Sequence, residues 1–176
     1  KIVDDDGKEI EWDGSTQGDL YCKGAAVVKR YLKMDNLAVD NDNWFNTGDV
    51  ATIDKNGYMR ITDRSKDVIK SGGEWISSID LENAAVGHSN VAEAAAIGVP
   101  HPKWDERPVL VIVTNDGKEA DKDSIITHVS ERVAKWQKPD DVIFVDEIPH
   151  TATGKISKLE LRKLVANLDY KHPDLR

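Results

Sequence analysis

The pattern of apolar and polar positions predicts β-structure from residue 1 to about residue 62. The clearest unit is a hairpin in which Ala51 and Ile53 precede a turn and Met59 and Ile61 follow it. The intervening DKNG supplies the Asn-Gly pair that tight turns favour. A second segment, GDLYCKGAAVVKRYL, is predicted to hold one or two further strands.

The pattern changes after Thr62. The segment DRSKDVIKSGG is charged and ends in two glycines, so we expect a connection or hinge there rather than a core element. Beyond it, strands and helices are predicted to alternate. The first expected helix is residues 77–86, with Ser77 and Asp80 as a weak capping box and Gly87 as the stop. The second lies within DSIITHVSERVAKW, where Ile126, Val129 and Val133 have helical spacing. The third begins at a capping box of Ser157 and Glu160, and its expected buried side chains are Leu161, Leu164, Val165 and Leu168.

The expected strands of this second region are Val91–Val99, ended by Pro100, then PVLVIVT and DVIFVDE. PVLVIVT is a continuous apolar run, which is typical of a strand covered on both faces. We therefore predict an α+β fold. A β-rich remnant over residues 1–63 precedes a C-terminal α+β domain over residues 64–176, and the tail DYKHPDLR is expected to fray.

Composition narrows the function classes. The 176 residues carry a net charge of −8, which argues against a non-specific nucleic-acid binder. The single cysteine, Cys22, cannot form an internal disulfide, and no Cys/His spacing resembles a zinc site, so we predict no metal site. No apolar run is long enough to cross a bilayer, so a cytoplasmic enzyme or binding module is the default expectation.

The first candidate for chemistry is Lys155, in the loop of IPHTATGKISKLELRK. A phosphate-binding P-loop needs a second glycine upstream and Ser or Thr after the lysine, but Pro149 and Ile156 occupy those positions. What remains is a mobile positive charge before a helix, suited to developing negative charge on phosphate or carboxylate oxygens. The alternative is a solvated loop lysine.

Two other segments are candidates. In WFNTGD, Asp49 could accept hydrogen bonds from two neighbouring hydroxyls, such as a ribose diol, or it could merely cap a turn. In DRSKDVIKSGGEW, Arg64, Lys66 and Lys70 lie beside a Gly-Gly pair, which fits a polyphosphate ligand or equally a solvated linker. The five histidines are scattered, and we assign none a catalytic role.

These segments occur together, in order, in a known family. WFNTGD, GYMRITDRSKDVIKSGGEWIS, VAEAAAIGVPHPKWDERPV and PHTATGKISKLELRK resemble the C-terminal part of the acyl-adenylate-forming enzymes. That family includes acyl-CoA synthetases, firefly-type luciferases and peptide-synthetase adenylation domains. The wording KSGGEWISSIDLE and HPKWDERP is most similar to the medium- and long-chain fatty acyl-CoA synthetases.

The resemblance implies a role for each matched residue. Asp49 would bind the ribose hydroxyls of ATP with help from Arg64, and Lys66 would occupy the hinge. Lys155 would contact the carboxylate and the nucleotide during adenylation. The loop from Lys70 to Trp75 would face the active site in the second half-reaction, with Lys70 and Trp75 contacting nucleotide and with Gly72, Gly73 and Glu74 on the CoA side.

The resemblance further implies ATP, Mg²⁺ and CoA as ligands and a fatty acid as substrate. The family's phosphate loop and acyl pocket lie upstream, and nothing in this sequence matches them. Because the chain also begins at Lys1 in strand-like sequence, we expect a fragment that is inactive without its N-terminal domain. Two alternatives stay open: a fatty acyl-AMP ligase that serves a carrier protein, and a non-catalytic interaction module. Oligomeric state is open, as is peripheral membrane association, because relatives that use long acyl chains often sit near membranes.

Overall fold

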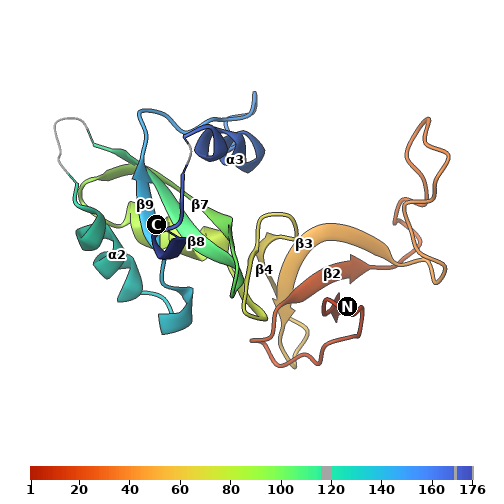
Figure 1. The fold of residues 1–176 in the computed structure, drawn as a ribbon. Helices are drawn as coiled ribbons and strands as arrows, with labels where there is room; N and C mark the ends of the chain where they lie inside the picture. Colours follow the sequence, from red (N-terminus) through yellow and green to blue (C-terminus); the bar gives the residue numbers. More distant parts are fainter. Residues whose placement is uncertain (116–119, 169, 176) are drawn as a thin grey trace. The chain divides into compact units, whose positions relative to one another are not determined.

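The chain folds into two compact units, Lys1–Lys66 and Asp67–Arg176, each with its own sheet (Figure 1). The structure is a computed structural model, and it describes residues 1–115, 120–168 and 170–175. Within those ranges, no helix is long and apolar enough to cross a membrane. The predicted join between residues 63 and 64 falls inside a strand of the first unit, because Arg64 still pairs with Asp49.

The first unit is a four-stranded antiparallel sheet in the order β1-β2-β3-β4. Its strands are β1 (Ile2–Val3), β2 (Gly18–Cys22), β3 (Phe45–Ile53) and β4 (Met59–Arg64). The predicted β3–β4 hairpin is confirmed, with Ile53 opposite Met59 and Ala51 opposite Ile61. Its turn is organised by Asp54, whose carboxylate accepts hydrogen bonds from the backbone N–H groups of Asn56 and Tyr58.

Between β2 and β3 the chain makes a long excursion, residues 23–44, with turns, bends and one isolated bridge. GDLYCKGAAVVKRYL therefore contributes one strand, β2, and its second half is irregular. Large apolar side chains of the excursion are exposed: Val28, Tyr31, Leu32, Met34 and Leu37. Leu32 is 90% exposed. Such a concentration of exposed apolar side chains is unusual for a surface that faces only water.

The second unit has a five-stranded sheet in the order β6-β5-β8-β7, with β9 parallel to β8. Its strands are β5 (Ile69–Ser71), β6 (Glu74–Ile76), β7 (Val91–His101), β8 (Asp105–Thr114) and β9 (Asp141–Phe144). The helices are α1 (Ser78–Val86), α2 (Lys122–Ser130) and α3 (Lys158–Asn167), with short 3₁₀ turns at Lys135–Gln137 and Pro173–Leu175. The predicted α+β fold is confirmed.

Two apolar cores lie on opposite faces of this sheet, and β8 contributes to both. Leu110 and Ile112 pack in the core that holds α1, α2 and the β5–β6 hairpin. Val109 and Val111 pack in the core that holds α3 and the segment before it. All four are fully buried, so the prediction that PVLVIVT is covered on both faces is confirmed.

Helix starts were predicted with mixed success. The Ser77 side chain accepts a hydrogen bond from the backbone N–H of Asp80, as expected for the start of α1. For α3 the predicted capping box is wrong, because the Ser157 side chain makes no capping hydrogen bond and Glu160 pairs with Lys163 instead. Leu161 and Val165 are buried as predicted, whereas Leu168 is exposed at the end of α3.

Three other predictions need correction. Val68 and Ile69 are buried in the first core, so the segment expected to be only a connection also supplies core residues. β7 continues through Pro100 to His101, since a proline is tolerated on a strand at the end of the sheet order. The tail is ordered where the structure describes it, and His172 is 3% exposed. Asp169 and Arg176 of that tail lie outside the described residues.

Candidate functional site

Lys155 lies at the end of a tight loop that is closed by its own backbone. The N–H of Thr151 donates to the carbonyl of Lys155 at 2.7 Å, and the N–H of Gly154 donates to the carbonyl of Thr151 at 2.9 Å. Gly154 has φ of +79°, which an L side chain rarely adopts. The N–H of Lys155 donates to the Thr151 hydroxyl at 3.2 Å. The loop thus fixes the lysine backbone and leaves its side chain exposed.

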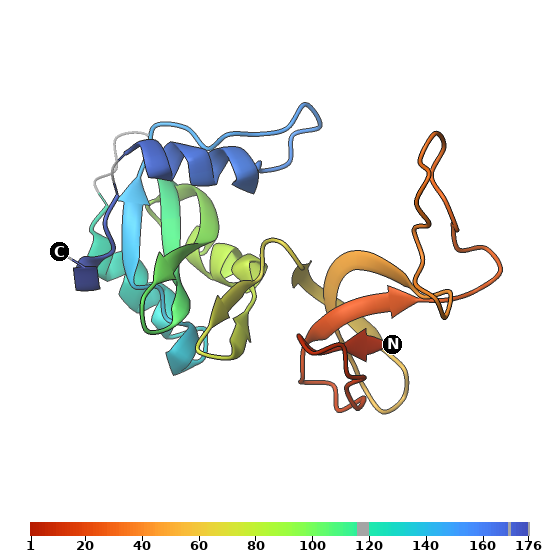
Figure 2. The same ribbon diagram turned by 45° about the vertical axis from the view of Figure 1, so that its right-hand side comes forward.

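The base of this loop is attached to the body of the second unit. His150 Nε2 lies 2.6 Å from Glu93 Oε1 of β7, and His150 forms a β-bridge with Ile156. Ile148 and Ile156 pack with the core under α3. Figure 2 shows the loop projecting beyond the start of α3. The exposed Lys155 side chain is therefore carried by a loop whose base is supported by the core.

The helix after the loop is anchored by a largely buried ion pair. Lys158 Nζ lies 2.8 Å from Glu82 Oε1 of α1, with the two side chains 10% and 16% exposed. The same Glu82 oxygen accepts the backbone N–H of Ala96 at 2.9 Å, and Lys158 also donates to the Ser78 hydroxyl. One lysine therefore connects α3 to α1 and β7.

The Gly72–Gly73 pair forms the turn of the β5–β6 hairpin. Both glycines have positive φ, +59° and +87°, as the turn requires. The N–H of Gly72 donates to the Trp104 carbonyl at 2.9 Å, and a Cβ on Gly72 would lie 2.8 Å from the Trp104 ring. Beside the turn, the Lys70 ammonium lies 4.4 Å from the centre of the Trp75 ring, a cation–π contact. Glu74 is exposed.

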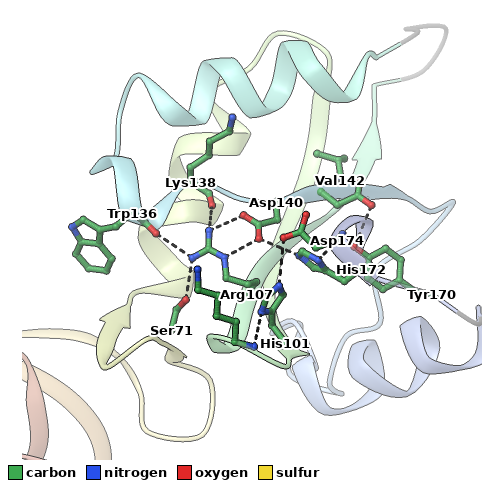
Figure 3. Close-up of polar contacts among 12 residues, drawn as sticks. Ser71, His101, Arg107, Trp136, Lys138, Asp140, Val142, Tyr170, His172 and Asp174 are labelled. Carbon is green, nitrogen blue, oxygen red and sulfur yellow. Dashed lines mark hydrogen bonds and ion pairs between the residues drawn. The ribbon is translucent and has the colours of Figure 1, made fainter. Parts of the chain in front are cut away.

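Two side chains of β8 hold this hairpin in place. Glu106 Oε2 accepts the backbone N–H of Lys70 at 3.1 Å, and it crosses close to Gly98, where a Cβ would be 2.5 Å away. Arg107 donates to the Ser71 hydroxyl at 3.0 Å. Figure 3 shows Arg107 at the centre of a network that also contains Asp140 and the carbonyls of Trp136 and Lys138. The glycine turn is thus held from outside, by residues far along the chain.

In the first unit, Asp49 and Arg64 face each other across β3 and β4. Arg64 Nη1 lies 2.8 Å from Asp49 Oδ1, with the two side chains 56% and 21% exposed. The N–H of Asp49 donates to the Thr47 hydroxyl at 3.1 Å, so the TGD corner has a defined shape. Lys66, the predicted hinge residue, is the last residue of this unit and is exposed.

His101, His172 and Asp174 form a cluster with the residue types of a metal site. Ligand atoms of His101, His172 and Asp174 lie within 4.8 Å of one another. However, both histidines accept a backbone N–H at Nδ1, from Lys103 and from Asp174, which leaves the proton of a neutral ring on Nε2. A metal would need that Nε2 lone pair. The arrangement therefore fits N–H groups that face carboxylates better than it fits metal ligands.

Asp140 and Asp141 have pKa values held below the ordinary aspartate range. For Asp140, burial alone would raise the pKa, but the hydrogen bonds and charge of Arg107, together with His172, outweigh it. For Asp141, burial would again raise the pKa, but the hydrogen bonds from Lys122, the Val142 N–H and the Tyr170 hydroxyl, with the charge of Lys122, outweigh it. Both carboxylates are thus stabilised in the ionised form.

Comparison with known proteins assigns the second unit. Residues 80–155 match the family model described as AMP-binding enzyme C-terminal domain. This match lies within the second unit. A 3-methylmercaptopropionyl-CoA ligase of Ruegeria pomeroyi is 55% identical over 93% of this chain, and a medium-chain-fatty-acid–CoA ligase of Ectopseudomonas oleovorans is 47% identical over 93%. ATP-bound MatB from Rhodopseudomonas palustris superposes with a TM-score of 0.80 at 31% identity, over 96% of this chain and 34% of MatB.

The AMP-binding C-terminal domain is the part of the family that the motifs predicted, so the resemblance to acyl-adenylate-forming enzymes is confirmed. The chain spans 30% of the length of each of these two ligases. The individual site residues remain predictions, as does the join between residues 63 and 64.

Sequence reasoning missed four contributors: Trp104, Glu106, Arg107 and Lys158. Each acts through a contact between distant parts of the chain, the longest being Lys158 to Ser78. Trp104 and Arg107 lie in the quoted HPKWDERP segment, so the motif pointed at the right place without indicating their contacts.

Proposed function

We propose that this chain is the C-terminal part of an ATP-dependent acid–thiol ligase. The complete enzyme would convert an aliphatic carboxylic acid first to its acyl adenylate and then to its CoA thioester. The observation that carries the proposal is the presence of two different loops on the AMP-binding C-terminal domain. One presents a single exposed lysine, and the other is a glycine turn that hydrogen bonds from β8 hold in place.

In the first half-reaction, a carboxylate oxygen attacks the α-phosphorus of ATP. A C–O–P bond forms, the bond to pyrophosphate breaks, and acyl-AMP and pyrophosphate result. Two anions must approach each other, so a positive charge between them lowers the barrier. Lys155 is the residue we assign to this role, because its loop fixes the backbone and leaves the ammonium to reach into a site.

In the second half-reaction, the CoA sulfur attacks the acyl carbon. The C–S bond forms, the bond to AMP breaks, and the thiol proton passes to solvent. We assign the Gly72–Gly73 turn and Glu74 to the CoA side, since open space lies where Gly73 would carry a side chain, which allows close approach of a narrow thiol arm. Exchange of the two loops requires rotation of the second unit, with Lys66 at the hinge.

Nucleotide binding is assigned to four residues. Asp49 would accept hydrogen bonds from the ribose hydroxyls, with its carboxylate oriented by Arg64. Lys70 and Trp75 would contact the nucleotide from the hairpin, through charge and ring face respectively. ATP would enter as its magnesium complex, because the assigned loop side chains are mainly cationic and suit phosphates rather than a metal ion.

For the acid, we propose an aliphatic chain of medium or greater length, as in fatty acyl-CoA synthetases. The rival is a short thioether-containing acid, since one of the compared relatives, at 55% identity, is named for 3-methylmercaptopropionyl-CoA. The acyl pocket would be supplied by an N-terminal domain of the same protein. The exposed apolar side chains of residues 28–37 support such a neighbour. Alone, the 176-residue chain is expected to be inactive.

Two alternatives define the outcomes of the test. A fatty acyl-AMP ligase would carry out the first half-reaction and transfer the acyl group to a carrier protein instead of CoA. A non-catalytic interaction module would carry out neither half-reaction.

The test uses the full-length protein and measures acid-dependent exchange of pyrophosphate into ATP, and separately the conversion of supplied acyl-AMP and CoA to acyl-CoA. Lys155→Ala should lower exchange by about 100-fold and leave thioester formation largely intact. The matched control is Lys163→Ala, which removes an exposed lysine of α3 paired with Glu160 and should leave both rates unchanged.

Exchange that survives Lys155→Ala would remove the adenylation role of this lysine. Exchange without any CoA-dependent thioester formation would favour the carrier-protein alternative, and absence of both in the wild type would favour the interaction module. Comparing octanoate with 3-methylmercaptopropionate as the acid decides between the two acid classes.

A further inference from the structure

Arg107 uses its entire hydrogen-bonding capacity on one network. Its five N–H groups reach five acceptors: both Asp140 oxygens at 2.6 and 2.8 Å, the Ser71 hydroxyl at 3.0 Å, the Lys138 carbonyl at 3.1 Å and the Trp136 carbonyl at 3.3 Å (Figure 3). The side chain is 15% exposed. A guanidinium has five donors in a planar fork, so no donor is left over.

The acceptors belong to two segments that β8 separates in the sequence. Ser71 is the residue immediately before the Gly72–Gly73 turn and is 7% exposed. Trp136, Lys138 and Asp140 belong to the connection that leads into β9. Asp140 is further held by its own N–H, which donates to the Pro108 carbonyl at 2.9 Å, and by His172 at 3.1 Å. Arg107 therefore joins the glycine turn to the 136–140 connection, and Asp140 and His172 extend the network to the C-terminal tail.

This geometry cannot be reproduced by another cation. The bidentate pair with Asp140 requires two parallel N–H groups, which Nε and Nη2 of Arg107 supply. The bond to Ser71 comes from the third nitrogen, Nη1. A lysine would keep the charge, but its three donors sit on one atom and cannot make the bidentate pair with Asp140 together with the bonds to Ser71 and the two carbonyls.

We infer that Arg107 is a positioning residue for the thioester half-reaction, which holds the Gly72–Gly73 turn at a fixed place relative to the 136–140 connection. The inference rests on the proposed function, in which that turn lies on the CoA side. Arg107 acts through Ser71 and is not itself assigned a contact with substrate. The Lys155 loop is closed by hydrogen bonds between its own residues, so we expect the adenylation step to depend much less on Arg107 than the thioester step does.

The test compares Arg107→Lys and Ser71→Ala with the wild type in the full-length protein. Arg107→Lys should lower the efficiency of acyl-AMP conversion at limiting CoA by at least 10-fold, mainly through a higher KM for CoA, while pyrophosphate exchange changes less than twofold. Ser71→Ala, which removes one of the five acceptors, should shift the same step by about threefold. The control is Arg132→Lys, at a half-exposed arginine whose ion pair is with its neighbour Glu131, and it should change neither rate.

A second readout separates this inference from the proposed function. Amide hydrogen exchange of residues 69–76 in the full-length protein should speed up at least 10-fold in Arg107→Lys and not in Arg132→Lys. Unchanged exchange there, or equal losses in both half-reactions, would overturn the positioning role. If the wild type makes acyl-AMP but no acyl-CoA, the proposed function fails instead, and the hydrogen-exchange result still decides whether Arg107 fixes the turn.

Discussion

The glycine turn and the lysine loop are both short, glycine-containing and exposed, yet they are held in opposite ways. The turn at Gly72–Gly73 depends on Trp104, Glu106 and Arg107, more than 30 residues further along the chain. The loop at Thr151–Lys155 depends on hydrogen bonds between its own residues. The first is shaped by tertiary structure and the second by local backbone chemistry.

The difference matches what each loop is proposed to do. A surface that receives a thiol arm must keep its shape, so external support of the turn is useful. A lysine that meets a developing charge must place an ammonium group at the end of a flexible side chain, and a fixed backbone is sufficient for that. The two loops also rest on different cores, the turn on the face with α1 and α2 and the loop on the face with α3.

The largest expected effect tests the external support of the turn. Gly72→Ala should destabilise the second unit by about 3 kcal/mol, because positive φ costs about 1 kcal/mol and the new methyl would meet the Trp104 ring. Gly73→Ala is the matched control: its φ is also positive, but no atom lies within 4 Å of the added methyl, so about 1 kcal/mol is expected.

Urea unfolding, monitored through the hydrogen exchange of β7 and β8 peptides, measures the destabilisation caused by each of the two substitutions. Equal destabilisation by the two substitutions would mean that Trp104 yields and does not support the turn.

A smaller effect is expected from the ion pair between Lys158 and Glu82, which connects α3 to α1. Lys158→Met should destabilise the second unit by about 2 kcal/mol, because Glu82 would lose its cationic partner in a largely buried position. Lys163→Met, on the same helix but exposed, should change stability by less than about 0.5 kcal/mol. The same unfolding measurement applies, and a neutral Lys158→Met would show that α3 does not need this anchor.

Next in size is the lysine loop itself. Gly154→Ala should cost about 1 kcal/mol, since φ is +79° and nothing lies within 4 Å of the added methyl. The destabilisation should stay local, so hydrogen exchange should rise at residues 151–155 and remain unchanged at residues 69–76. A change at the glycine turn would contradict the separation of the two loops.

The smallest effect is a pH dependence of the Arg107 network. Because the folded pKa of Asp140 lies below its ordinary value, its ionised form stabilises the fold above the ordinary aspartate pKa. That contribution is lost as the pH falls through the lowered pKa. Asp140→Asn should therefore cost somewhat less than about 1 kcal/mol at pH 7, because asparagine keeps one oxygen that accepts from Arg107, and the difference in stability from wild type should narrow on acidification. A difference that is constant from pH 7 to pH 3 would exclude ionisation as its source.

Much of the fold was predictable because its signals are local. The β3–β4 hairpin is indicated by the DKNG turn, the start of α1 by Ser77, and β8 by an unbroken apolar run. Failures arose where tertiary contacts override local preference. Ser157 looked like a helix cap but makes no capping bond, and the charged segment around Val68 is drawn into the core by its two apolar residues.

The candidate site divides in the same way. The positions of Lys155 and of the glycine pair could be read from motifs, since glycine and lysine in a loop leave a local signature. The roles of Arg107 and Glu106 could not, because a charged residue at the start of a strand has no pattern that indicates a partner 30 residues away. The Asp49–Arg64 pair was expected as two ligands of one nucleotide, and the structure adds that they bind each other.

The alternation of β8 has a consequence for how this protein can be altered by mutagenesis. Its even-numbered side chains Leu110 and Ile112 belong to one core, and its odd-numbered side chains Val109 and Val111 belong to the other. A library that varies only the even positions would explore one layer of the protein while the opposite layer keeps its wild-type packing. The packing of the two cores can therefore be varied in separate rounds of mutagenesis, although both cores include side chains of the same strand.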